Sequence, residues 1–187
     1  MGLVEVGVGL IPAWGGCTEL LARSAANPKT PRGPMPALAP VFETISTAKV
    51  AKSAAEAKDM LYLRSSDGIT MNRDRLLADA KAKALELAEN YTPPEKPTYT
   101  LAGPGGKAAL DMFVHGFRLQ GKATPHDAVV CDHLARVLTG ADADFTEPVG
   151  EDRLLELERD AFMALVREPG TIDRIEHMLT TGKPLRN

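Results

Sequence analysis

The feature that most constrains the fold is the uniform helical character of the chain after residue 107. Apolar residues there recur at helical spacing, which predicts helices over residues 107–118, 124–138, 151–167 and 171–181. Thr124 followed by Pro125 is typical of a helix start, because the threonine oxygen can accept a first-turn N–H and proline suits the first helical position. The second part of the chain is therefore expected to contain helices only.

In the first forty residues, the predicted elements are short and are interrupted by glycine and proline. The Val-, Ile- and Gly-rich run from Leu3 to Ile11 predicts a short buried strand or extended connection. A helix is expected to begin at Gly15–Gly16 and to run to Arg23, with its free N–H groups facing the preceding turn. Five prolines between Asn27 and Pro40 predict a surface loop, because proline disfavours continuous helix and central strand.

Helical spacing returns between residues 41 and 89. It predicts a helix over 41–50, and Ser53 followed by Glu56 forms a capping pattern for a helix over 54–60. Residues 73–89 predict the clearest helix, with one apolar face formed by Leu76, Ala80, Ala84, Leu87 and Ala88. A Pro/Gly-rich stretch follows, so we expect a first region over 1–92, a linker over 93–106 and a helical region over 107–187.

Charge and cysteine content exclude several classes of protein. The net charge of −3 argues against nucleic-acid binding, which depends on clustered Lys and Arg. Cys17 and Cys131 form no CxxC pair, which argues against a disulfide framework and favours a reducing compartment. No apolar run approaches the roughly 20 residues that span a bilayer. A soluble, cytoplasmic protein is the expectation.

Metal binding is not expected either. The sequence has no His-Glu-x-x-His motif, and His126 and His133 are better explained as solvent-facing or hydrogen-bonded side chains than as ligands. The two cysteines have no evident general-base partner, so small core residues are the simpler interpretation.

One motif does point to chemistry. Glu5 lies inside the apolar run, and Pro12 and the Gly15–Gly16 pair follow it at the start of the predicted helix. A partly desolvated carboxylate at such a position suits proton exchange with a reacting carbon or with water. The competing interpretation is a solvated glutamate on an edge segment.

This motif resembles the crotonase-family segment in which an active-site glutamate precedes L-G-x-x-P-[GA]-x-G-G. The resemblance places Glu5 at the second catalytic glutamate, and places Gly9, Pro12, Gly15 and Gly16 at the structural positions of the substrate-site turn. Trp14 stands where a small residue is common, and Leu61 where glycine usually ends a helix. The run from Glu158 to Phe162 also resembles a Glu-Arg-x-Ala-Phe stretch of crotonases, although a core role for Phe162 is the simpler interpretation.

Further segments resemble the C-terminal region of bifunctional bacterial 3-hydroxyacyl-CoA dehydrogenase/enoyl-CoA hydratases: residues 42–64, 71–94 and 175–187. The resemblance implies a mixed α/β, mostly α-helical fold, namely the C-terminal portion of a crotonase-like domain followed by a helical extension. It implies fatty-acid β-oxidation, with acyl-CoA as the substrate. CoA would arrive as part of the substrate, and NAD would serve only the dehydrogenase part, so no cofactor is expected in this chain.

The family takes its first catalytic glutamate and both oxyanion-hole N–H groups from segments upstream of this motif, so the chain is expected to be incomplete as a hydratase by itself. The alternative is a non-catalytic helical module that docks on a partner subunit, or a homo-oligomer. The all-helical second part of the chain favours this alternative.

Overall fold

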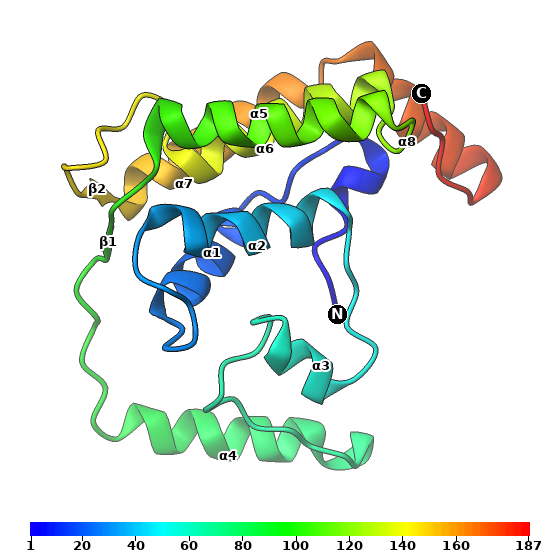
Figure 1. The fold of residues 1–187 in the computed structure, drawn as a ribbon. Helices are drawn as coiled ribbons and strands as arrows, with labels where there is room; N and C mark the ends of the chain where they lie inside the picture. Colours follow the sequence, from blue (N-terminus) through cyan, green and yellow to red (C-terminus); the bar gives the residue numbers. More distant parts are fainter.

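The computed structural model describes residues 1–187 and is mostly helical (Figure 1). The helices are η1 (Glu5–Val8), α1 (Gly16–Ala26), α2 (Pro34–Ser46), α3 (Ala54–Asp59), η2 (Arg73–Arg75), α4 (Leu76–Ala88), α5 (Gly103–Leu119), α6 (Pro125–Thr139), α7 (Glu151–Leu165) and α8 (Pro169–Thr181). Two short strands, β1 (Thr98–Tyr99) and β2 (Val149–Gly150), pair antiparallel. The expectation of a mostly helical mixed α/β chain is confirmed at this level.

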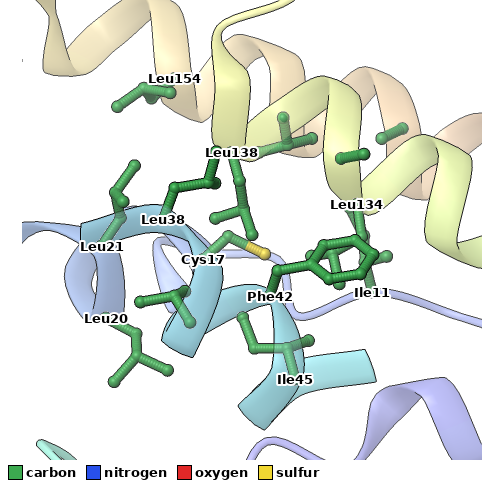
Figure 2. Close-up of a cluster of buried hydrophobic side chains, with 14 of the residues drawn as sticks. Ile11, Cys17, Leu20, Leu21, Leu38, Phe42, Ile45, Leu134, Leu138 and Leu154 are labelled. Atoms are coloured by element: carbon green, nitrogen blue, oxygen red, sulfur yellow. The ribbon is translucent and has the colours of Figure 1, made fainter. Parts of the chain in front are cut away.

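The helices form a layered body with one shared core. In Figure 1, α5, α6 and α7 lie together on one side, and α1 and α2 pack beneath them. Figure 2 shows side chains from both layers meeting around the sulfur of Cys17. This apolar cluster includes Ile11, Cys17, Leu38, Phe42, Leu134, Leu138 and Leu154, all almost fully buried. Residues on both sides of the 93–106 stretch therefore build the same core, while the three-part domain division stays a prediction.

Helix α4 stands apart from this body. It lies beyond α3 at the edge of the molecule in Figure 1, and none of its residues is buried. The helix was predicted correctly. Its predicted apolar face is exposed, however: Leu76 is 53% exposed and Leu87 is 61% exposed.

The strand predicted over Leu3–Ile11 is wrong. The chain forms the short 3-10 helix η1 there, and its N–H groups bond locally, with Gly7 donating to Val4 at 2.9 Å and Gly9 donating to Val6 at 3.1 Å. A strand needs neighbouring strands to accept its N–H groups, and this segment has only an isolated bridge between Gly2 and Val50. The apolar residues of the run serve the core without any sheet.

The proline-rich loop is also shorter than predicted, because α2 begins within it at Pro34. Pro34 and Pro36 occupy the first turn, where backbone N–H groups have no helical partner to lose. Pro40 lies inside the helix and removes one backbone bond. Burial of the α2 face that includes Phe42 and Ile45 outweighs that loss. The helix then ends at Ser46, before the predicted Val50.

The predicted linker ends earlier than expected. Gly103–Gly106 forms the first turn of α5, and Thr98–Tyr99 is paired in the small sheet. Gly103 has φ +57°, and a Cβ there would collide with the carbonyl oxygen of Ala143. This close approach requires glycine, so what suggests a flexible linker in the sequence is a tight packing contact.

The other helix starts agree with their predicted caps. The Ser53 side chain accepts the Glu56 N–H, and Thr124 forms a reciprocal capping box with Asp127. The Glu56 carboxylate in turn accepts a hydrogen bond from the Lys52 N–H at 2.6 Å. No helix of the chain is both long and apolar enough to cross a membrane.

Candidate functional site

Glu5 borders a groove of about 910 Å³. The Glu5 side of this groove comes from η1 and the turn after it, and the opposite side comes from α7. Its lining residues are Glu5, Ala13, Trp14, Asp152, Leu155, Glu156, Arg159, Phe162 and Met163. The groove thus combines an apolar patch with several charged groups.

The Glu5 carboxylate differs from the other acids in the groove. Its Oε2 atom is buried and has no hydrogen-bond partner. Asp152 pairs with Lys96 at 2.6 Å, and Glu156 pairs with Arg153 at 3.5 Å. A buried carboxylate oxygen with unused lone pairs is uncommon in proteins, and such an oxygen retains the capacity to accept a proton.

The turn between Pro12 and Gly16 forms one rim of the groove and leads into α1. Trp14 has φ +61° and is fully exposed, and Gly15 has φ +89°. A Cβ on Gly16 would lie 2.7 Å from the Cβ of Pro12, so this position needs glycine. The Pro12–Gly16 segment is therefore a tight turn, and Trp14 lines the same groove as Glu5. The role of these residues in a substrate site stays a prediction.

Glu158 fixes this turn from α7, and it was not among the predicted site residues. Its carboxylate is 1% exposed and accepts the Gly15 N–H at 2.7 Å. It also accepts the backbone N–H and the hydroxyl of Thr18, both at 2.6 Å. An anion at this place satisfies free N–H groups of α1 and complements the positive end of the helix. The resemblance of residues 158–162 to a crotonase stretch was the available signal.

Gly9 belongs to a different cluster, away from the groove lining. Its carbonyl accepts the Thr171 hydroxyl at 2.8 Å, and that hydroxyl lies 2.9 Å from Nε2 of His126. Because the only hydroxyl proton of Thr171 is used on Gly9, Nε2 of His126 must be the donor. Burial, together with the Arg174 charge, lowers the pKa of His126 and so favours this neutral form.

Thiol and metal chemistry find no support around these residues. The Cys17 thiol donates to the Pro12 carbonyl at 3.1 Å, and burial with the nearby Glu158 charge raises its pKa well above the usual range. Burial raises the pKa of Cys131 to about 12. Both therefore stay protonated and unreactive as nucleophiles. No group of three or more His, Cys, Asp or Glu side chains is placed to hold a metal ion.

The sequence of this chain is similar to those of two proteins named for 3-hydroxyacyl-CoA dehydrogenation or fatty-acid oxidation. The chain is 43% identical over 188 residues to a probable 3-hydroxyacyl-CoA dehydrogenase of Bacillus subtilis (strain 168), covering all of this chain and 23% of that protein. It is 30% identical over 177 residues to a putative fatty acid oxidation complex trifunctional enzyme of Rickettsia felis, covering 94% of this chain and 21% of that protein.

The chain thus spans less than a quarter of the length of the curated relatives it matches. No family model matches it. No solved structure matches it either. The predicted similarity to 3-hydroxyacyl-CoA dehydrogenases of fatty-acid oxidation is confirmed, whereas the similarity to crotonase-type enoyl-CoA hydratases stays a prediction.

Proposed function

We propose that this chain is the C-terminal part of a fatty-acid oxidation enzyme, in which Glu5 transfers a proton during hydration of an enoyl-CoA thioester. The observation behind the proposal is the buried, unpartnered Oε2 of Glu5 at the edge of a large groove. Similarity to relatives named for 3-hydroxyacyl-CoA dehydrogenation and fatty-acid oxidation supports the substrate class.

The groove has features that suit an acyl-CoA. Leu155, Phe162 and Met163 offer an apolar surface for an acyl chain. Arg159 lies at the same groove with its side chain 72% exposed, where its guanidinium could meet phosphate oxygens. Glu5 would then face the reacting part of the substrate as the only groove carboxylate without a basic partner.

In the proposed reaction, one O–H bond of water breaks and its oxygen bonds to the β carbon, while the π electron pair of the double bond forms a C–H bond at the α carbon. Glu5 would carry one of the two protons involved, either taking the proton that leaves water or giving the proton that the α carbon gains. A complete hydratase site, including a second carboxylate and N–H donors for the thioester oxygen, would require residues outside the Glu5 motif. CoA enters as part of the substrate, and we assign no NAD-binding residue in this chain.

Ligand binding in the groove is tested directly by the fluorescence of Trp14, the only tryptophan of the chain. Crotonyl-CoA should change Trp14 emission saturably, because this exposed ring lines the groove. Arg159→Met should weaken binding about threefold to tenfold by removing a phosphate contact. The matched variant Arg167→Met, which does not line the groove, should bind as the wild type does. Absence of any saturable change would contradict the proposal.

The exposed face of α4 favours a second candidate, a helical module that docks on a partner. Leu76 and Leu87 on this face are exposed, and no residue of α4 is buried. Light scattering distinguishes the two candidates: the docking module should associate, and Leu76→Ser with Leu87→Ser should abolish the association. A wild-type chain that is monomeric at all concentrations would count against the docking module.

A further inference from the structure

A second hollow of about 490 Å³ lies between α2, α5, α6 and the C-terminal tail, and it shares no lining residue with the Glu5 groove. We propose that this cavity binds a fatty carboxylate, with its hydrocarbon chain against three phenylalanines and its anionic end at Lys122. The proposal concerns a separate site and does not depend on the hydratase assignment.

The apolar wall is a continuous aromatic row. Phe42 and Phe113 meet edge-on with ring centroids 6.5 Å apart, and Phe113 and Phe117 lie 4.7 Å apart. Val114, Val130 and Leu185 extend the apolar lining. Phe113 nevertheless stays 46% exposed, although it sits at the centre of this row. An apolar chain that covered this ring would be favoured, because it would remove exposed aromatic surface from water.

Most charged side chains that line the cavity are paired within the protein. Arg174 is 3% exposed and pairs with Asp127 at 2.7 Å, and Arg186 approaches the same carboxylate at 3.5 Å. Glu43 is paired with Lys49 at 2.7 Å. Both acids of the lining are therefore neutralised within the protein.

Lys122 is the remaining charge, and it has no acidic partner. Its Nζ lies 5.5 Å from the centroid of the Phe117 ring, which brings the free cation to the end of the aromatic row. Arg186 donates to the Lys122 carbonyl at 2.9 Å, which holds the tail beside this cation. An excess positive charge next to a hydrocarbon-lined cavity matches a ligand that has one anionic end and an apolar body.

Hollows of this volume fall within the usual range for small-molecule sites, about 300–1,000 Å³. The tail residues 184–186 form one wall, and their contacts with Lys122 and Asp127 are at the surface. The end of the tail is held more firmly, because Asn187 accepts a hydrogen bond from Arg174 at 2.7 Å and donates one to the Gly170 carbonyl at 3.0 Å. A ligand would therefore enter by displacing the contacts of residues 184–186 while Asn187 stays anchored.

Calorimetric titration with decanoate tests the proposal, with decanol as a neutral probe of equal chain length. Decanoate should bind, and Lys122→Met should weaken it about tenfold while leaving decanol binding unchanged. Methionine keeps the apolar stem beside Phe117, and Lys122 is exposed, so folding should be preserved. Lys81→Met, on the remote helix α4, is the matched control and should leave decanoate binding intact.

Trp14 fluorescence locates the bound probe, because Trp14 lines only the other groove. Its emission should stay constant during the decanoate titration. A parallel titration with decanoyl-CoA shows whether the acyl chain is bound as the free acid or as a thioester. With either probe, a binding heat that is smaller in Lys122→Met than in the wild type supports binding in this cavity. Equal affinities in wild type and Lys122→Met, no binding at millimolar decanoate, or a decanoate-dependent change in Trp14 emission would overturn the proposal.

Discussion

At the scale of single residues, two buried polar groups organise the region around Glu5. Glu158 holds the start of α1 through three hydrogen bonds, and the Thr171 hydroxyl links His126 to the Gly9 carbonyl. Neither group lies in the lining of the Glu5 groove, so both act on its shape and stability. Replacing either residue should therefore lower the free energy of unfolding, with any effect on the reaction following from that loss of stability.

Glu158→Gln should lower the free energy of unfolding by about 2–4 kcal/mol, because an amide NH₂ would face backbone and hydroxyl donors in a buried place. Urea denaturation measures this. The neighbouring Glu156→Gln is the matched control, since Glu156 is exposed, and it should change stability by less than about 0.5 kcal/mol. A loss of equal size in both variants would show that the buried hydrogen bonds of Glu158 are unimportant.

The buried neutral His126 predicts a pH dependence of folding. Its folded pKa lies below the ordinary 6.5, so the unfolded chain takes up a proton first as the pH falls. The contribution of His126 is therefore fully present above pH 6.5 and is lost as the pH falls through the lowered folded value. Denaturation curves between pH 5 and 8 should show this decline, and it should be smaller in His126→Gln. The same slope in both proteins would refute the assignment.

The left-handed conformation of Trp14 predicts a stabilising substitution. A non-glycine residue at φ +61° costs about 1–2 kcal/mol, and the fully exposed ring contributes no burial in return. Trp14→Gly should raise the free energy of unfolding by roughly 0.5–1 kcal/mol after the entropy of the unfolded glycine is counted. Thermal denaturation followed by circular dichroism measures it, and a lower midpoint for the variant would contradict this reasoning. Leu61 also has φ +61°, so it adopts the left-handed conformation that glycine would adopt without strain.

At the scale of elements, the sequence predicted best where the signal was local. The caps at Ser53 and Thr124 depend on neighbouring residues, and both were predicted correctly. The apolar run from Leu3 to Ile11 was misjudged, because strand formation depends on partner strands that local sequence does not show. Pro34 at the start of α2 was misjudged for a related reason: a buried face that includes Phe42 overrides the weak helix propensity of the region.

The isolation of α4 predicts a large difference in local stability between helices. Its amides should exchange with solvent much faster than those of α6, because α4 has no buried residue whereas α6 contributes Leu134 and Leu138 to the core. Hydrogen exchange followed by mass spectrometry measures this. Protection of α4 equal to that of α6 would show that α4 is covered in solution, as the docking module requires.

At the scale of the whole molecule, one core joins segments that the sequence presents as separate. Ile11, Phe42 and Leu138 pack together although a proline- and glycine-rich stretch divides them in the chain (Figure 2). The candidate site depends on this shared core, because Glu5 precedes the 93–106 stretch and Phe162 follows it, and both line the groove. The sequence predicted Glu5 and the glycine turn through the motif, but only the fold shows that α7 supplies the other wall.

The central claim is that Glu5 exchanges a proton with an enoyl-CoA, and the rate of crotonyl-CoA hydration tests it most directly. Glu5→Gln preserves the size of the side chain while removing its ability to take up a proton. Introduced into the full-length enzyme of which we propose this chain is a part, it should lower the rate by about 10²-fold or more. Glu156→Gln, in the same groove, should hydrate crotonyl-CoA at the wild-type rate. Equal rates for wild type and Glu5→Gln, whether above the buffer rate or at it, would contradict the claim.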